Sequence, residues 1–316
     1  MRIACIIPTY NGEAQLLRLL DSLSLQSTIL DILIVDSGST DGTQEILKAR
    51  VGSFKIIASS EFNHGGTRQF MVEQHPYYDF FVFMTQDAYL VESDSIARII
   101  EPFQDPEVGA ICGRQLPHID ATPIAQHARI FNYPEEVQVK TVDDIRRFGI
   151  KTAFMSNSFS AYRALALQAV GGFPKHVIFA EDMYVAAKML LAGWKVAYAG
   201  NAICSHSHNY TIRQEFMRYF DMGVFHAREP WIRHYFGDTG DEGLRFLKSE
   251  FNFLGLRRLN WLISASLRNA AKFLGYKLGT NEAKLPVGLK RKFGMHKLFW
   301  DGPYSVTGHN NSINKK

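Results

Sequence analysis

The sequence predicts an α/β protein: a twisted, mostly parallel, doubly wound sheet flanked by helices, with a basic helical extension at the C-terminus. Three observations indicate this fold class. Apolar runs with the length of buried strands recur in the first part of the chain, and the clearest is Phe80 to Met84. Helical patterns separate these runs, which is typical of a parallel sheet. Positive charge then gathers between Arg245 and Lys297.

The first part of the chain supplies four predicted strands and two helices. In chain order we expect a strand at 3–7 ended by Pro8, a leucine-rich helix at 15–25, a strand at 31–35, a helix at 44–49, and strands at 54–58 and 80–84. No GxGxxG follows the first strand, and no GxxxxGK[ST] occurs anywhere. The sequence therefore argues against a dinucleotide dehydrogenase and a P-loop NTPase.

Shorter elements are predicted after residue 100. In order they are a strand at 108–112, a strand-like segment rich in hydroxyl side chains at 152–162, a helix at 164–170, a helix ending at Leu191, and a strand at 195–198. Gly171 and Gly193 close the two helices. Residues 130–152 show no clear periodicity.

Bulk composition excludes several classes of protein. A net charge of +4 is too small to indicate nucleic acid binding. The three cysteines lie far apart, which suits free thiols in a reducing compartment, and no CxxC pair predicts a zinc site. No signal peptide precedes the first strand, and no window reaches the roughly 18 uncharged apolar residues of a membrane span. We therefore expect a cytoplasmic protein.

Two carboxylates follow predicted buried strands. Asp87 comes just after the run at 80–84, and Asp36 comes directly after the strand at 31–35. Because ligands of an open α/β sheet collect at the carboxyl ends of its strands, both side chains should face the binding crevice. Asp87 could instead cap the next helix, but residues 93–95 lie closer to it. The Asp36 carboxylate could accept the imino N–H of a uracil or thymine ring.

Two further loops carry less specific patterns. Asp41 precedes Gln44 by three residues, which favours a structural capping box. The loop Asn63-His64-Gly65-Gly66-Thr67-Arg68 contains two glycines that would let the backbone approach a ligand closely. Arg68 is expected to open a helix whose N-terminus favours anions.

Taken together and in this order, four segments resemble the large family of inverting, GT-A-type bacterial glycosyltransferases, family 2. They are Pro8-Thr9-Tyr10-Asn11, Val35 to Thr43, Asn63 to Arg68, and Thr85-Gln86-Asp87. The Asn-His-Gly-Gly loop and the Gln-Asp-Ala variant resemble, more narrowly, its rhamnosyltransferases. The resemblance covers residues 1–230, and it implies the GT-A (Rossmann-like) fold.

The resemblance also implies a general base. Two adjacent acids at a helix start could simply complement the helix dipole. Here, however, Glu181-Asp182 followed by Ala192-Gly193-Trp194 is similar to the family's Glu-Asp motif. In that motif the Asp is the general base, so the resemblance assigns this role to Asp182, with Glu181 beside it.

A divalent metal, Mg²⁺ or Mn²⁺, is implied as well. The family's Asp-x-Asp motif reads Thr85-Gln86-Asp87 here, so the last Asp remains as a metal ligand and the first is lost. Metal binding should then be weaker or need help from elsewhere in the chain. The family's late His corresponds to His206, with His208 as second choice. We expect at most one of them at a metal site, because residues two apart in a strand point opposite ways.

The activity that the resemblance implies is metal-assisted, inverting transfer of L-rhamnose from dTDP-L-rhamnose to a polyprenyl-diphosphate-linked glycan, in bacterial surface polysaccharide synthesis (O-antigen or capsule-like). The implied nucleotide-sugar-binding residues are Pro8, Thr9, Tyr10, Asn11, Asp36, Asn63, His64, Gly65, Arg68, Gln86 and Asp87. A UDP-linked hexose or N-acetylhexosamine donor remains an alternative. So does a non-catalytic sugar-nucleotide-binding scaffold, although the joint presence of Asp87, Glu181-Asp182 and His206 argues against it.

The last part of the sequence is basic. Between Arg245 and Lys297 there are twelve Lys or Arg, against Glu250 and Glu282 alone, with aromatic and aliphatic residues interleaved. A basic helix with Trp and Phe on its other face lies in a membrane interface, where anionic headgroups attract it. The alternative is a helix packed on the catalytic domain with a solvated basic side.

These patterns divide the chain into three predicted parts. Residues 1–230 would form the catalytic domain, with a nucleotide-binding half at 1–115 and an acceptor half at 116–230. Residues 231–307 would form a helical, basic and aromatic membrane-associating extension, followed by a disordered tail at 308–316. The protein would then be peripheral on the inner face of the bacterial cell membrane.

Overall fold

One mixed sheet runs through the part of the chain that the computed structural model describes, residues 1–238, 240–255 and 258–305. The strand order is β3-β2-β1-β4-β8-β6-β9-β5, and β7 also pairs with β9. The strands are β1 Ile3–Thr9, β2 Asp31–Asp36, β3 Lys55–Ile56, β4 Phe80–Met84, β5 Tyr89–Leu90, β6 Val108–Leu116, β7 Gln138–Lys140, β8 Phe159–Arg163 and β9 Lys195–Ser205.

Strand direction decides which loops can meet. The strands β3, β2, β1 and β4 pair in parallel, and β6 pairs in parallel with β9. Between these groups β8 is antiparallel to both β4 and β6, while β5 and β7 are antiparallel to β9. Within the described residues six strands therefore run one way and three the other, and the predicted mostly parallel sheet is confirmed. The antiparallel direction of β8 was not predicted.

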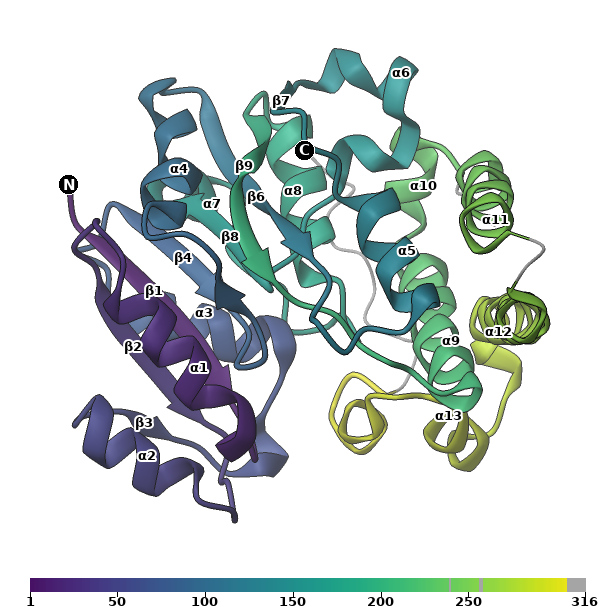
Figure 1. Cartoon of the computed structure of the whole chain (residues 1–316), viewed down its shortest axis with the longest axis horizontal. Helices are drawn as coiled ribbons and strands as arrows, with labels where there is room; N and C mark the ends of the chain where they lie inside the picture. Colours follow the sequence, from purple (N-terminus) through teal and green to yellow (C-terminus); the bar gives the residue numbers. More distant parts are fainter. Residues whose placement is uncertain (239, 256–257, 306–316) are drawn as a thin grey trace.

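Helices cover both faces of this sheet (Figure 1). In chain order they are α1 Glu13–Ser24, α2 Thr43–Arg50, α3 His64–Gln74, α4 Ser95–Ile100, α5 Pro123–Asn132, α6 Ile145–Phe148, α7 Ala164–Ala169, α8 Glu181–Leu191, α9 Ile212–Arg228, α10 Pro230–Phe236, α11 Gly240–Leu254, α12 Leu259–Gly279 and α13 Val287–Phe293. The helices α11 and α12 lie on the side of the molecule away from β2 and β3.

Alternating side chains of β1 show why the strand sequences are apolar throughout. Ile3, Cys5 and Ile7 pack in one buried cluster with residues of α1 and α4. Ala4 and Ile6 point the other way, into a second cluster with residues of α3, α7 and α8. Because both faces of the sheet are covered, no position of the strand can be polar without cost.

Some predicted boundaries were wrong. Pro8 does not end the first strand, because β1 continues to Thr9 and Pro8 pairs with Val35 of β2. A proline is tolerated in a strand where its missing N–H removes no needed hydrogen bond. The third strand is only Lys55–Ile56, and β9 runs to Ser205 rather than ending at residue 198.

The C-terminal helices pack on the end of the α/β unit through α9. The helices α9 and α12 approach closely because glycines lie between them: a Cβ on Gly275 or Gly279 would come within 2.3 Å or 2.0 Å of a backbone oxygen of α9. In the described ranges no helix has both the length and the apolar character needed to cross a bilayer. The predicted disordered tail, 308–316, lies outside the described residues.

Candidate active site

Loops from five strands meet at one edge of the sheet. The carboxyl ends of β1, β2, β4, β6 and β9 lie there because these strands run in the same direction. The strand β8 runs the other way, so the loop before it, which contains Asn157, joins the same edge. Asp87 follows β4 and His206 follows β9 directly. Residues far apart in the sequence thus lie together at this edge of the sheet, the rim.

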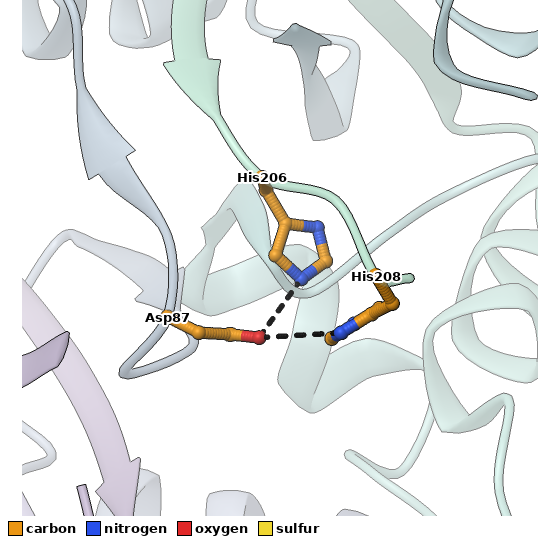
Figure 2. A group of neighbouring side chains, drawn as sticks. All are labelled: Asp87, His206 and His208. Carbon is orange, nitrogen blue, oxygen red and sulfur yellow. Dashed lines mark ion pairs between the residues drawn. The ribbon is translucent and has the colours of Figure 1, made fainter. Parts of the chain in front are cut away.

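Asp87, His206 and His208 form a group of possible metal ligands, with their side chains converging in Figure 2. Asp87 Oδ2 lies 3.4 Å from His206 Nε2 and 3.6 Å from His208 Nδ1. The expectation that at most one histidine faces this site was wrong. The strand β9 ends at Ser205, so the alternation of side chains in a strand does not apply to the loop that carries both rings.

Gln115 of β6 fixes the tautomer of His206. His206 Nδ1 lies 2.8 Å from Gln115 Oε1, and Arg129 Nη1 donates to the same oxygen at 2.6 Å. Because a guanidinium can only donate, this Gln115 atom is an acceptor, and His206 Nδ1 must carry the proton. When the ring is neutral, His206 Nε2 then directs an electron pair toward Asp87.

The charges of this group suit a divalent cation. Burial alone would raise the pKa of the Asp87 carboxyl, but the nearby His206 and His208 outweigh burial and hold that pKa well below its usual range. Burial lowers the pKa of His206, and burial together with His206 lowers the pKa of His208 to about 3. At neutral pH the group therefore offers one carboxylate and two neutral imidazoles, all in metal-binding form.

The acid pair Glu181-Asp182 opens α8 at the same rim. Glu181 Oε1 lies 3.0 Å from Arg68 Nη1 and accepts a hydrogen bond from Asn157 Nδ2 at 2.9 Å, and all three side chains are buried. Asp182 accepts hydrogen bonds from the backbone N–H of Asn157 at 3.0 Å and of Met183 at 2.8 Å. The two acids thus share Asn157 but have different surroundings.

These surroundings separate the two pKa values. Burial raises the pKa of Asp182 to about 7, and the charge of Glu181 adds to this effect. Burial opposes ionisation of Glu181 too, but the Arg68 guanidinium holds its pKa below the usual value. Glu181 is therefore a fixed negative charge, and Asp182 is a group that can accept a proton near neutral pH.

Hydrogen bonds connect the acid pair with the group around Asp87. Gln115, which accepts from His206, also donates from Nε2 to Ser156 Oγ at 2.8 Å. The next residue, Asn157, donates its backbone N–H to Asp182. Asp87 and Asp182 therefore belong to one connected part of the rim and do not lie on opposite sides of the molecule.

The turn after β1 is built on Gln86. Its Oε1 accepts the Tyr10 N–H at 2.8 Å, and its Nε2 donates to the Tyr10 carbonyl at 3.0 Å. Asn11 adopts a left-handed conformation, with φ of 46°, and its Oδ1 accepts the Thr40 N–H at 2.9 Å. Thr9 is buried, whereas the Tyr10 side chain is 50% exposed. Of these residues Tyr10 offers an open aromatic face at the rim.

Asp36 is fully buried and organises its own loop. Its carboxylate accepts hydrogen bonds from Ser39 Oγ, the Ser39 N–H (2.9 Å), Gln44 Nε2 (2.9 Å), the Gly38 N–H (3.1 Å) and Thr9 Oγ1 (3.3 Å). The predicted capping box between Asp41 and Gln44 is therefore absent, since the Gln44 side chain goes to Asp36. Contact between Asp36 and a base remains a prediction, and it would require one of these donors to leave.

The segment Asn63 to Arg68 differs from its prediction. The helix α3 begins at His64, and Asn63 caps it by accepting the Gly66 N–H at 2.7 Å. Arg68 therefore does not open the helix. It is buried, donates to the His64 carbonyl at 2.9 Å and pairs with Glu181. In this structure it holds the acid pair, and its predicted contact with the donor stays a prediction.

Gly65 allows α3 to pack closely against the backbone at Pro174, because a Cβ at position 65 would lie 1.9 Å from the Pro174 carbonyl oxygen. Gly65→Ala should therefore lower the free energy of unfolding by about 1–3 kcal/mol or more. Urea unfolding measures this change. Gly243→Ala is a matched control, since nothing lies within 4 Å of its Cβ, and it should stabilise by about 0.4–1 kcal/mol. Equal losses in both variants would contradict the packing argument.

Comparison with known proteins identifies the family. The family model described as "Glycosyl transferase family 2" matches residues 4–171, which is more than half of the chain. This protein belongs to that family. It is a glycosyltransferase, as the sequence resemblance implied.

Relatives cover the chain almost completely. It is 49% identical to the O-antigen chain rhamnosyltransferase RfbN of Salmonella typhimurium. The 304 aligned residues cover 95% of this chain and 96% of that protein. It is also 49% identical over 298 residues to the O-antigen chain rhamnosyltransferase WbaN of Salmonella anatum, spanning 94% and 95%. The narrower resemblance to rhamnosyltransferases is thus confirmed.

Solved structures share the fold. The mannosyltransferase PcManGT from Pyrobaculum calidifontis, in complex with GDP-Man and Mn²⁺, superposes with a TM-score of 0.63 at 17% identity over 90% of this chain and 88% of that one. TarS residues 1–349 of S. aureus with UDP gives a TM-score of 0.52 at 16% identity over 89% and 91%. The GT-A fold of this glycosyltransferase is therefore confirmed.

Two residues of the candidate site were missed from the sequence. Gln115 and Asn157 orient His206, Glu181 and Asp182, yet each looks ordinary in its local sequence. Gln115 could have been noticed as a polar residue near the end of an apolar strand. Asn157 could not have been noticed in this way, because its place at the rim depends on the antiparallel direction of β8.

A cleft of about 480 Å³ opens beside the possible metal ligands. Asp87 and His208 lie in its wall, together with polar side chains of α1 and of the loops after β6 and β9, among them Gln15, Arg18, Asp120 and Asn209. Polar walls next to these possible metal ligands offer hydrogen-bond partners for a phosphorylated or glycosyl ligand.

Proposed function

We propose that this glycosyltransferase moves L-rhamnose from dTDP-L-rhamnose to a hydroxyl of a polyprenyl-diphosphate-linked glycan during O-antigen synthesis. The named activity of RfbN and WbaN, which match nearly the whole chain at 49% identity, supports rhamnose and O-antigen. The dTDP carrier and the lipid-linked acceptor follow from the resemblance of the four sequence motifs. A UDP-linked donor is the alternative, and the donor experiment distinguishes it from dTDP-L-rhamnose.

The residues of the rim support an inverting displacement. Asp182 would remove the proton from the acceptor hydroxyl, and the oxygen would attack the anomeric carbon on the face opposite the diphosphate. The bond between that carbon and the diphosphate oxygen then breaks, and its electron pair leaves with dTDP. The observation that carries this proposal is the raised pKa of Asp182, at a position linked by hydrogen bonds to the group around Asp87.

Asp87, His206 and His208 would hold a divalent cation, Mg²⁺ or Mn²⁺. When bound, it neutralises charge on the leaving diphosphate. The two histidines would supply ligands in place of the family's first Asp, whose position is occupied by Thr85. They favour Mn²⁺ over Mg²⁺, because Mg²⁺ prefers an all-oxygen octahedral shell, whereas imidazole suits softer metals.

Tyr10 and the loop after β2 are the best supported contacts for the nucleoside. The Tyr10 ring is half exposed beside the Asp36 loop, and Gln86 holds its backbone. We retain Asn11, Asn63 and His64 as proposed contacts. The buried Pro8–Thr9 backbone, Gly65 and Arg68 would act by shaping the site.

The donor experiment compares dTDP-L-rhamnose with UDP-glucose and UDP-N-acetylglucosamine. A ligand that binds only the folded protein raises its stability, by about 2.7 kcal/mol at a concentration of 100 Kd. We expect a rise in Tm with dTDP-L-rhamnose and Mn²⁺, and transfer of labelled rhamnose to membranes that carry the lipid-linked glycan. A rise with a UDP sugar alone would contradict the proposed donor.

We further propose that the extension after residue 230 holds the protein on the inner face of the cell membrane. Exposed apolar side chains line one side of α12: Leu259, Ile263, Leu267, Phe273 and Leu274. Exposed cations lie on the same C-terminal part of the chain: Lys248, Arg258, Lys277, Lys284, Arg291, Lys292 and Lys297. An apolar stripe with surrounding positive charge suits the surface of an anionic bilayer.

Removing apolar contacts from α12 should release the protein from vesicles. In the double variant Leu267→Glu/Phe273→Glu, side chains that are 53% and 67% exposed become charged. Since burying one such side chain contributes about 1.5–3 kcal/mol, sedimentation with phosphatidylglycerol vesicles should weaken at least about tenfold. Leu165→Glu on α7, where the side chain is 70% exposed, is the control. Equal sedimentation of both variants would contradict this surface.

A further inference from the structure

The chain returns from the C-terminal helices to the rim at His296, just after α13. Asp221 of α9 is fully buried and accepts hydrogen bonds from the backbone N–H of Met295 at 2.9 Å and of His296 at 3.0 Å. The same carboxylate oxygen, Oδ2, lies 2.7 Å from His296 Nδ1. Because a carboxylate only accepts, Nδ1 carries the proton, and the imidazole is fixed in one orientation.

The fixed ring of His296 touches both segments that support the acid pair. It stacks on Phe179, with ring centroids 5.7 Å apart and an interplanar angle of 16°. It also meets His64 edge to face, with centroids 4.6 Å apart. The backbone carbonyl of His64 in turn accepts a hydrogen bond from Arg68, which pairs with Glu181.

The segment next to Phe179 needs such support. Ala180, between Phe179 and Glu181, has a left-handed backbone with φ of 61°, which is unfavourable for alanine because of its Cβ. A conformation of this kind persists only where the surrounding structure holds it. The direction in which α8 starts, and with it the position of Asp182, depends on this residue.

We propose that His296 is a positioning residue for the base: through Phe179 and His64 it holds the turn at Ala180 and so sets the place of Asp182. This inference rests on the proposed role of Asp182. It assigns a part in the reaction to a residue that lies outside residues 4–171, which match the family model, and that has no contact with the possible metal ligands among the described residues.

The inference predicts a larger change in turnover than in donor binding. Displacing a reacting group by about 1 Å can cost about 100-fold in rate. His296→Ala should therefore lower kcat about 10- to 100-fold, while the KM for the donor changes by a smaller factor, because the ring touches one proposed donor contact, His64, and the others lie on other loops.

Three variants separate the two contacts of the ring. His296→Phe keeps an aromatic ring against Phe179 and His64 but loses the hydrogen bond to Asp221. His296→Asn keeps a donor for Asp221 but loses the ring, and His296→Ala loses both. We expect kcat to fall least in one or both of the first two variants and most in His296→Ala. His234→Ala, at an exposed histidine of α10, is the control and should keep the kcat of the unaltered protein.

Donor-binding stoichiometry by calorimetry, measured on each variant, corrects kcat for the folded fraction. If the corrected kcat of His296→Ala equals that of the unaltered protein while Asp182→Asn is inactive, this inference alone is overturned. If Asp182→Asn is itself fully active, the assignment of the base fails, and the inference fails with it.

Discussion

Replacing Asp182 by asparagine is expected to lower kcat about 10²- to 10⁴-fold, the range typical of a lost general base, while donor affinity stays nearly unchanged. The amide keeps the size of the side chain but cannot take a proton. Within the described residues, Asp182 Oδ2 accepts from the Asn157 N–H and Oδ1 from the Met183 N–H, so the amide keeps one of these two bonds, and neither bond goes directly to the group around Asp87.

Steady-state transfer rates give kcat, and calorimetry with dTDP-L-rhamnose gives the donor affinity separately. Asp143→Asn is a suitable control, because Asp143 is an exposed carboxylate on another part of the surface. A turnover number for Asp182→Asn within a few-fold of the control would remove Asp182 from the role of base.

The pH dependence of transfer should report the same group. Because burial and the charge of Glu181 raise the pKa of Asp182 to about 7, the carboxylate is lost as the pH falls below that value. We therefore expect kcat/KM to decrease about tenfold per pH unit below pH 7, with donor affinity measured at each pH as the reference. A rate that stays constant down to pH 5 would mean that the base titrates elsewhere.

Local sequence was enough to place the first half of the site. The run Phe80 to Met84 is buried at every position, and the predicted place of Asp87 after it, at the carboxyl edge of the sheet, agrees with the structure. The same reasoning placed Asp36 correctly at the end of β2, although the number of hydrogen bonds that it accepts within its own loop was not foreseeable. Strand ends are local properties, so they can be read from one segment.

The rest of the site depends on contacts between distant segments. Arg68 looked like an anion ligand because its partner, Glu181, is more than a hundred residues away. The packing reason for Gly65 was missed because Pro174, which fills the space beside it, is equally distant, while the predicted contact of this loop with a ligand stays a prediction. His206 and His208 were assigned to opposite faces of a strand that in fact ends one residue earlier. In each case the sequence suggested a local cause and could not show the tertiary contact.

Removal of His206 should be the second large effect. We expect His206→Ala to weaken Mn²⁺ binding by more than about 100-fold, because losing a ligand should cost more than the 10- to 100-fold that is typical of losing a residue behind a ligand. Transfer should fall in parallel and recover in part at high Mn²⁺. Calorimetry with Mn²⁺ in the absence of donor measures the affinity, with His234→Ala as control. Unchanged Mn²⁺ affinity would mean that Asp87 and His206 do not hold a metal.

Gln115 allows a finer test of the same site, because it contacts His206 and not the metal position. Gln115→Leu removes the acceptor that keeps the proton on Nδ1, so His206 can also place a proton on Nε2, where it would face Asp87 and exclude a cation. We expect Mn²⁺ affinity to fall about 10- to 100-fold. Gln138→Leu on β7 is the matched control, since its side chain is partly buried in another part of the sheet. Equal Mn²⁺ affinity in the two variants would contradict the assigned tautomer, even if His206→Ala had already established that His206 is a ligand.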